Sequence, residues 1–235
     1  MKTTINRFLR SLFDAISPRV CVICGRRLTI DEEVLCIPCY ANLPRTWYDE
    51  RAEDNELARL FWGRVPIERA VALCFYQSHS YFSRLIYMMK YKNHPEAARY
   101  LGRIMAEELL SSGFFEGIDA LVPVPITRRR RHQRGYNQSM EIALGVSRAT
   151  GLPVIDKALV RTSFTGSQTK LGRLQRQDNV EKVFHLVRPQ LVAGLHVLVI
   201  DDIVTTGATI VSCMHELRKA EGTRLSLLAA GFTKN

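Results

Sequence analysis

The chain has 235 residues, of which 46% are hydrophobic and 24% are charged, and this is the composition of an ordinary soluble globular protein. No stretch approaches the roughly 18 consecutive apolar residues needed to cross a bilayer. Arg7 and Arg10 interrupt the apolar residues near the N-terminus, where a secretion signal would need a continuous run. These features exclude an integral membrane protein and a secreted one, and we expect a cytoplasmic location.

The net charge of +10 is unevenly distributed. Residues 119–182 contain 12 Lys/Arg against 5 Asp/Glu. A solvated helical face would mix the two signs, so this excess predicts a polyanionic partner. Diphosphate and nucleic acid both fit, and charge alone does not choose between them.

Residues 1–19 are predicted to form an amphipathic helix that ends at Ser17-Pro18. Two interpretations of it remain open. The helix packs on the rest of the protein, or its basic residues hold it at a membrane surface. The apolar positions at helical spacing are Ile5, Phe8, Leu9, Leu12, Phe13 and Ile16.

A four-cysteine module is predicted over residues 20–48. Two C-x2-C pairs eleven residues apart can close a tetrahedral site for a structural Zn²⁺. The alternatives are disulfides or a redox pair, which are less common in a cytoplasmic chain. The predicted ligands are Cys21, Cys24, Cys36 and Cys39. The other two cysteines, Cys74 and Cys213, are expected to be buried thiols.

Residues 49–55 are predicted to be a linker, and 56–235 a second domain. Strands and helices alternate in that domain, which predicts an α/β fold with a mostly parallel sheet and helices on both faces. The expected strands cover 70–76, 120–125, 153–155, 197–201 and 225–232. The expected helices cover 56–62, 81–91, 95–111, 137–149 and 209–220. A long polar loop or hairpin is expected over 161–182.

The strongest functional signal lies at residues 197–209. An apolar run at 197–200 predicts a buried parallel strand, and Asp201 and Asp202 follow it, at the edge of the sheet where ligands bind. Small and hydroxylated residues then lead into a helix, an arrangement that can cradle phosphate with backbone N–H groups. These residues are Thr205, Thr206, Gly207, Ala208 and Thr209. The carboxylates would repel phosphate, so sugar hydroxyls and a cation such as Mg²⁺ suit them better.

This segment resembles the signature of the type I phosphoribosyltransferases. The resemblance implies that Asp201 and Asp202 hold the ribose hydroxyls of phosphoribosyl pyrophosphate and that residues 205–209 surround its 5-phosphate. Residues 122–139 are expected to form a basic loop on the same edge of the sheet, with Arg128 and Arg134 as candidates for binding diphosphate. The alternative for these arginines is a solvated basic surface. Residues 161–179 resemble the mobile catalytic loop of amidophosphoribosyltransferases, with candidate residues Arg161, Gln168 and Arg176.

In their order along the chain, these segments resemble the competence protein ComF and gluconate-utilisation GntX family. That order is the cysteine module, LIYMMKYKN around Lys90, VPVP with RGYNQ, the 161–179 segment and VLVIDDIVTTGAT. The resemblance implies a role in the uptake or use of external DNA, a competence helicase as a partner, and a diphosphate-binding role for Lys90. Lys90 can equally be a lysine that extends from an apolar helix to solvent.

Three interpretations of function therefore remain. The chain is an Mg²⁺-dependent glycosyltransferase of the type I phosphoribosyltransferase class, a module that binds ribose phosphate and single-stranded DNA without turnover, or a regulator that senses phosphoribosyl pyrophosphate. A transferase of this class needs a segment, called a hood, that covers the bound acceptor substrate. Trp47, Tyr48 and Trp62 either stack on a base there or are ordinary core residues.

Overall fold

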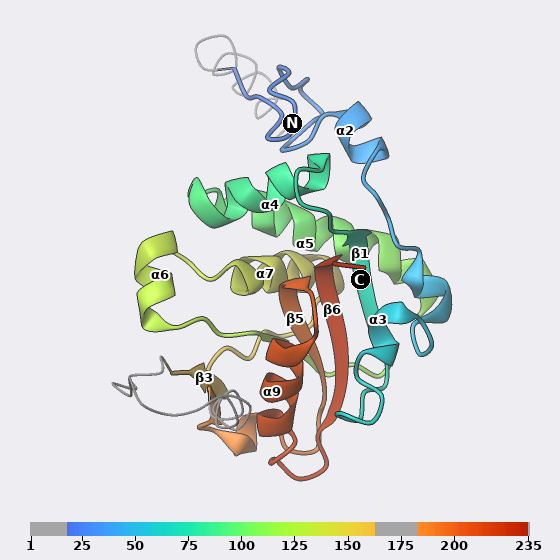
Figure 1. Cartoon of the computed structure of the whole chain (residues 1–235), viewed down its shortest axis with the longest axis vertical. Helices are drawn as coiled ribbons and strands as arrows, with labels where there is room; N and C mark the ends of the chain where they lie inside the picture. Colours follow the sequence, from blue (N-terminus) through green and yellow to red (C-terminus); the bar gives the residue numbers. More distant parts are fainter. Residues whose placement is uncertain (1–17, 163–182, 235) are drawn as a thin grey trace, which may run out of the picture.

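The computed structural model of this chain describes residues 18–162 and 183–234. Within them a four-stranded parallel sheet has the order β1-β6-β5-β2 (Figure 1). Its strands are β1 Ala70–Phe75, β2 Ala120–Pro123, β5 His196–Val204 and β6 Arg224–Phe232. The predicted fold class, a mostly parallel sheet with helices on both faces behind a small cysteine module, is confirmed.

Alternate residues of each strand face opposite layers of helices, as period-two strand geometry requires. In β5, Leu198 and Ile200 join one buried cluster, and Val197 and Val199 join the other. The first cluster includes α4 Tyr81–Tyr91, α5 Pro95–Leu109 and α7 Gln138–Thr150, and the second includes α3 Glu56–Arg59 and α9 Ala208–Leu217. No helix in the described part of the chain is long and apolar enough to cross a membrane.

Two glycines let α5 and α7 touch backbone to backbone. A Cβ atom on Gly145 would lie 2.1 Å from the carbonyl oxygen of Arg99, and one on Gly102 would lie 2.0 Å from that of Ile142. Both distances are far below any real contact, so neither position accepts a larger residue without separating the helices. This contact holds the middle of α7 against α5, while the start of α7 faces β5 through the Ser139–Asp201 hydrogen bond.

The remaining elements are short. They are α2 Ile37–Ala41, η1 Tyr48–Arg51, η2 Leu110–Ser112, β3 Leu159–Arg161, β4 Phe184–Leu186 and η3 Pro189–Leu191. β3 and β4 pair antiparallel and bracket residues 163–182, so most of the predicted 161–182 loop lies outside the described residues. The predicted strand at 153–155 is reduced to one parallel bridge between Leu121 and Val154. The predicted N-terminal helix also lies outside the described residues.

The basic segment expected to be a loop contains a helix, α6 Arg128–Arg134. The side chain of Thr127 caps its start by accepting a hydrogen bond from the Arg130 N–H, and Gly135 ends it with a φ of 81°. The loop prediction was wrong because α6 has no apolar residue and therefore no hydrophobic periodicity.

The predicted linker at 49–55 is packed against the sheet. The Ala70 N–H donates to the carbonyl of Ala52 at 2.8 Å, and the Asn55 side chain donates to the carbonyl of Ala70 at 2.8 Å. Nearer the C-terminal end of β1, the Thr46 N–H donates to the carbonyl of Leu73 at 3.0 Å. Residues 44–55 therefore cover the free edge of β1, which would otherwise expose unpaired backbone groups.

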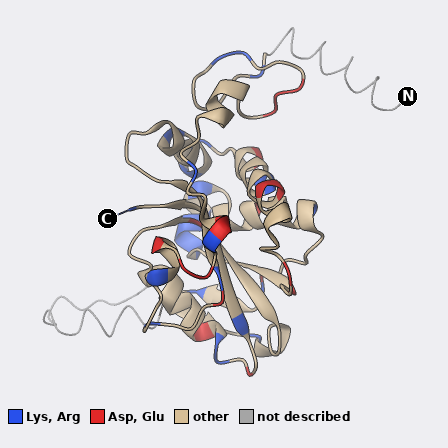
Figure 2. Cartoon of the chain, turned by 90° about the vertical axis from the view of Figure 1, so that its right-hand side faces the viewer, with Lys and Arg blue, Asp and Glu red and all other residues tan. Residues whose placement is uncertain are grey.

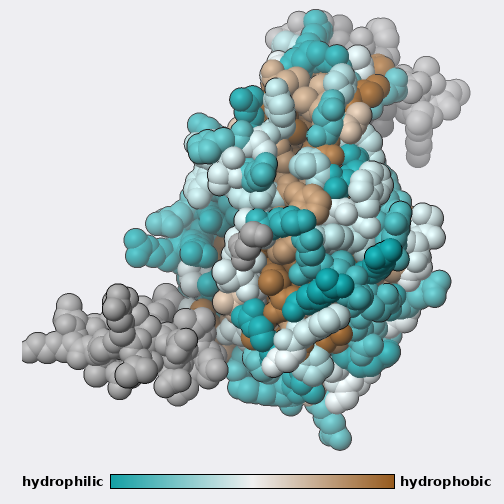
Figure 3. Space-filling model, turned by 45° about the vertical axis from the view of Figure 1, so that its right-hand side comes forward, coloured by the Kyte–Doolittle hydropathy of each residue, from teal (hydrophilic) through white to brown (hydrophobic). Residues whose placement is uncertain are grey.

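The N-terminal module stands at one end of the molecule but shares its core (Figures 1 and 2). Cys21 and Cys36 belong to the same buried cluster as Leu198 and Ile200 of β5. Arg45 forms a two-pronged ion pair with Glu108 of α5, with contacts of 2.7 and 2.9 Å. Figure 3 shows hydrophobic residues running from the module onto the body on this side of the molecule.

Candidate functional site

The two aspartates lie within β5, three and two residues before its last residue, Val204. β5 was expected to end at Asp201, but it continues because Ile203 and Val204 still pair with β6. β2 ends opposite Ile200, so the sheet is one strand narrower from Asp201 onward. The carboxylates therefore emerge where the sheet opens.

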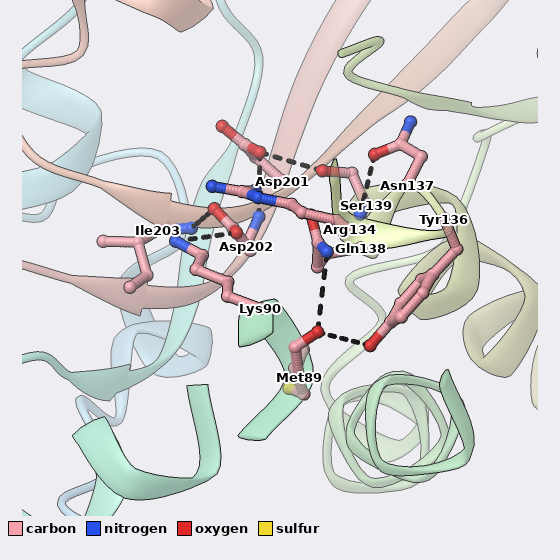
Figure 4. Close-up of polar contacts among 10 residues, drawn as sticks. All are labelled: Met89, Lys90, Arg134, Tyr136, Asn137, Gln138, Ser139, Asp201, Asp202 and Ile203. Atoms are coloured by element: carbon pink, nitrogen blue, oxygen red, sulfur yellow. Dashed lines mark hydrogen bonds and ion pairs between the residues drawn. The ribbon is translucent and has the colours of Figure 1, made fainter. Parts of the chain in front are cut away.

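Asp201 is almost fully buried, with 8% of its surface exposed. Its Oδ1 accepts hydrogen bonds from the Ser139 hydroxyl at 3.0 Å and from the Asp202 N–H at 2.9 Å (Figure 4). Burial, and secondly the negative charge of Asp202, raise the pKa of Asp201 to about 7. A carboxyl in this state takes up or releases a proton near neutral pH.

Asp202 is paired with a cation. Its Oδ2 lies 2.8 Å from the Nζ of Lys90, in the last turn of α4, and its Oδ1 accepts the Ile203 N–H at 2.7 Å. Both side chains are mostly buried, with 19% of Lys90 and 14% of Asp202 exposed. Lys90 therefore ends in an ion pair beside the two aspartates and does not extend freely into solvent.

The segment after α6 links the surrounding elements. The Asn137 side chain caps α7 by accepting the Ser139 N–H at 3.2 Å, and it donates to the carbonyl of Val124 at 3.0 Å. It thereby places the Ser139 hydroxyl against Asp201. The sequence prediction missed Ser139, although an Asn followed by a predicted helix was a readable cap signal.

The same segment fixes the end of α4. The Tyr136 hydroxyl donates to the carbonyl of Met89, and the Gln138 amide approaches the same oxygen at 3.5 Å. Arg134 in turn donates to the Gln138 side chain at 2.8 Å. These bonds set the position of Lys90, the next residue after Met89, and bring Arg134 into the group around the two aspartates (Figure 4).

The predicted phosphate loop is a tight turn into α9. Gly207 has a φ of 73°, a conformation that glycine adopts without strain. Arg64 donates to the carbonyl of Thr206 at 2.9 Å, and a Cβ on Gly207 would lie 3.3 Å from the ring of Phe61. The turn and the first residues of α9 line a small cavity of about 40 Å³ that also includes Asp201. The first N–H groups of a helix have no partner within the helix, so they are available to an anion there.

The four cysteines of the N-terminal module form one cluster. Their sulfur atoms all lie within 4.8 Å of one another, and those of Cys24 and Cys36 are 3.7 Å apart. Four sulfurs bound tetrahedrally to one zinc at about 2.3 Å would be about 3.8 Å apart. The cluster therefore has the spacing to hold a metal ion, and it leaves no ligand position for a substrate.

Glu32 organises this cluster and was not singled out from the sequence. It is buried, and it accepts the N–H groups of Thr29 at 2.8 Å and Ile37 at 2.7 Å and a hydrogen bond from Arg26. The two backbone hydrogen bonds hold the pKa of Glu32 below its usual value. The carboxylate joins the loop after the first cysteine pair to the turn that carries the second.

Comparison with known proteins gives the family. Over 194 residues the chain is 31% identical to DNA utilization protein YhgH of Escherichia coli, covering 81% of this chain and 80% of that protein. It is 28% identical to competence protein F of Haemophilus influenzae over 58% of this chain and 62% of that one. The chain belongs to the competence protein F (ComF) family. No general family profile matches it.

Comparison with solved structures gives more distant matches. One is described as the allosteric regulatory enzyme of purine biosynthesis, with a TM-score of 0.43 and 23% identity. The match covers 58% of this ComF-family chain and 26% of that one. A hypoxanthine phosphoribosyltransferase of Trypanosoma cruzi gives a TM-score of 0.37 and 14% identity over 60% of this chain and 76% of that one.

The remaining basic residues of this ComF-family chain separate into two groups. Arg128 and its three neighbours on α6 are exposed, whereas Arg134 is partly buried beside the aspartates. Arg161 lies at the end of β3 with its guanidinium 5.0 Å from the ring of Phe184. Burial, and secondly the charge of Arg130, lower the pKa of Arg161. Its Nε is buried without a hydrogen-bond partner among the described residues. Gln168 and Arg176 lie outside those residues.

The three aromatic residues considered for a hood lie in different places. Tyr48 packs edge-on against Phe75 at 5.7 Å and is a partly buried residue at the border of the core. Trp47, 66% exposed and in a left-handed conformation, lines a cavity of about 660 Å³ between α2, β1 and the end of α5. Trp62 is exposed and follows Phe61, whose ring faces the turn at Gly207. Cys74 and Cys213 are fully buried, as expected.

Proposed function

We propose that this chain binds phosphoribosyl pyrophosphate or a related ribose phosphate, together with Mg²⁺, at the end of β5, and that it serves the uptake or use of external DNA. The relatives named for DNA utilization and competence support the second part. The observation that carries the first part is the cluster at the end of β5. It combines two carboxylates, one of them paired with Lys90 at 2.8 Å, and a glycine turn that opens a helix within the same small cavity.

Each part of this cluster suits one part of the ligand. Asp201 and Asp202 would bind ribose hydroxyls, and the turn and helix start at 205–209 would bind the 5-phosphate. Lys90 and Arg134 would bind the diphosphate, with Arg128 further out on α6. In this assignment Arg161, Gln168 and Arg176 belong to a segment that closes over the ligand.

The donor set also fits Mg²⁺. The Oδ2 atom of Asp201 accepts no hydrogen bond from any described residue, and carboxylate oxygens are the hard ligands that this ion prefers. When bound, Mg²⁺ would offset negative charge on the diphosphate. The cysteine cluster fits a structural Zn²⁺, whose binding would supply folding energy to the module.

If turnover occurs, the chain is a glycosyltransferase of the type I phosphoribosyltransferase class. An acceptor would form a bond to C1 of the ribose as the bond from C1 to the diphosphate oxygen breaks, with positive charge developing on the sugar. The two carboxylates and the cations at the diphosphate would stabilise that charge distribution. Binding without turnover, or sensing of the ligand, uses the same residues. Release of diphosphate in the presence of a panel of nucleobases separates catalysis from these alternatives.

Calorimetric titration tests the binding proposal. The double variant Asp201→Asn, Asp202→Asn removes both charges while keeping the shape of the side chains, so we expect the folded protein to lose binding of ribose 5-phosphate and phosphoribosyl pyrophosphate. Asp156→Asn changes an exposed acid elsewhere and is the matched control. Wild-type affinity in the double variant would contradict the assignment.

Nucleic acid is the second partner that the charge distribution supports. Arg128, Arg129, Arg130 and Arg131 are exposed, and none of them pairs with a carboxylate in the part of the chain that the structure describes. Four adjacent cations exceed what one diphosphate needs. A single-stranded DNA partner would use them as phosphate contacts.

A further inference from the structure

The outward face of α4 carries three exposed tyrosines, Tyr81, Tyr87 and Tyr91, which we call the α4 tyrosine face. Their exposed fractions are 65%, 52% and 63%. The opposite side of the helix is fully apolar and buried, through Phe82, Leu85, Ile86 and Met89. At 3.6 residues per turn the three tyrosines fall within an arc of about 120°. Exposed aromatic residues grouped in this way mark a binding surface more often than isolated ones do.

Cations lie against the rings of this face. The Arg84 guanidinium is 5.4 Å from the centre of the Tyr81 ring, and that of Arg134 is 5.8 Å from the Tyr91 ring. The rings of Tyr87 and Tyr91 are 5.1 Å apart and inclined by 40°. Arg134 belongs to α6, which lies beside α4 (Figure 1). The tyrosine face therefore meets α6 at Arg134, and the exposed arginines at 128–131 occupy the earlier part of the same helix.

We propose that the α4 tyrosine face is a stacking surface for single-stranded nucleic acid, whose phosphates lie along α6. This inference rests on the proposed function, because it names the surface by which the chain would engage DNA. Bases of any sequence present flat aromatic faces that stack on tyrosine, and the backbone presents one negative charge per nucleotide to arginine. A duplex keeps its base faces covered, so this surface selects single strands.

The dimensions of α4 suit this partner. Ten residues separate Tyr81 from Tyr91, a rise of about 15 Å, so the face is long enough for two or three unstacked bases of an extended strand. The charge complements a polyanion as well. Arg84 and Arg134 lie against the rings of the face, and the four other arginines of α6 precede Arg134 on the same helix. The acidic pair Asp201 and Asp202 lies on the side of Lys90, one residue before Tyr91.

The test compares three variants of the full chain in binding to a fluorescent 20-nucleotide oligo(dT) over a salt series. The ring-removing variant is Tyr81→Leu, Tyr87→Leu, Tyr91→Leu. The ring-keeping control is Tyr81→Phe, Tyr87→Phe, Tyr91→Phe. The charge-removing variant is Arg129→Gln, Arg130→Gln, Arg131→Gln. We expect ring removal to weaken binding about tenfold for each ring that stacks on a base, without changing the slope of log affinity against log salt. The Phe control retains wild-type affinity. Charge removal lowers the slope by about 0.7 for each lost phosphate contact.

Several results would overturn the inference. They are unchanged affinity in the Leu variant, an equal loss in the Phe control, or tight binding of a 20-base-pair duplex that is equally sensitive to ring removal. A second measurement does not depend on the variants: an oligonucleotide containing 2-aminopurine is quenched when its base stacks, and unquenched emission in the wild-type complex also refutes stacking. Titration of the Leu variant with ribose 5-phosphate separates this inference from the proposed function. If the Leu variant keeps wild-type binding of both ribose 5-phosphate and DNA, only the tyrosine face is overturned. If the wild type does not bind ribose 5-phosphate, only the ligand site is overturned.

Discussion

Replacing Asp201 with Asn is expected to stabilise the ligand-free protein, by an amount that grows as the pH rises from about 4 to about 7. Asp201 is buried, its hydrogen bonds to Ser139 and to the Asp202 N–H can both be kept by an Asn oxygen, and its pKa is raised from 3.8 to about 7. Its burial, with the charge of Asp202, therefore makes the ionised form unfavourable in the folded state.

The direction and size of this stability change follow from the linkage between protonation and folding. Below pH 3.8 the carboxyl is protonated in both the folded and the unfolded chain, so it contributes nothing. As the pH rises, the unfolded chain ionises first and the folded chain loses stability until the pH passes about 7. The difference between these pKa values corresponds to up to about 4 kcal/mol of free energy of unfolding. In a chain of this length, that is roughly 8 to 16 °C in Tm.

Thermal and urea unfolding at pH 4.5, 6 and 8, without divalent cations or phosphates, measure this effect. The stability gained by Asp201→Asn should be small at pH 4.5 and largest at pH 8, and the exposed control Asp156→Asn should show no gain. A variant that is less stable than the wild type at pH 8, or equally stabilised at every pH, would refute the reasoning. Confirmation would mean that the chain keeps a costly carboxylate at this position, as expected at a binding site.

Two further predictions concern the metal and the helix contact. One Zn²⁺ per chain should copurify with the protein, as measured by elemental analysis. Cys36→Ser should remove the metal and destabilise about the first 50 residues, which limited proteolysis would detect. Freshly purified protein without zinc would contradict this prediction. Gly145→Ala should lower the free energy of unfolding by about 2 kcal/mol, because its Cβ would meet the Arg99 carbonyl at 2.1 Å, despite a gain of about 1 kcal/mol in helix propensity. Leu144→Ala on the exposed side of α7 is the control, and an equally stable Gly145→Ala protein would show that the two helices can separate freely.

The sequence predicted the sheet well because its strands are continuous apolar runs and lie between clear turn signals. It also predicted the boundaries of α4, where Ser80 caps the start, and the turn from Asp202 into α9. These features depend on local chemistry. The buried thiols of Cys74 and Cys213 followed from the same kind of pattern.

The features it missed depend on contacts between distant segments. Ser139 meets Asp201 across 62 positions of sequence, and Arg64 meets Thr206 across 142. Neither partner carries a local signal for the other. Helix α6 was missed because arginines show no hydrophobic periodicity, although Thr127 and Gly135 signal both of its ends.

The cover on the edge of β1 affects how the chain can be divided. Residues 44–55 satisfy backbone groups of Ala70, Leu73 and Phe75 that no other strand reaches. A fragment that begins at residue 56 would carry the whole sheet but would leave these groups unpaired along one side. Such an edge pairs readily with the same edge of another molecule. Self-association of a shortened chain would then reflect this uncovered strand and would say little about the oligomeric state of the intact protein.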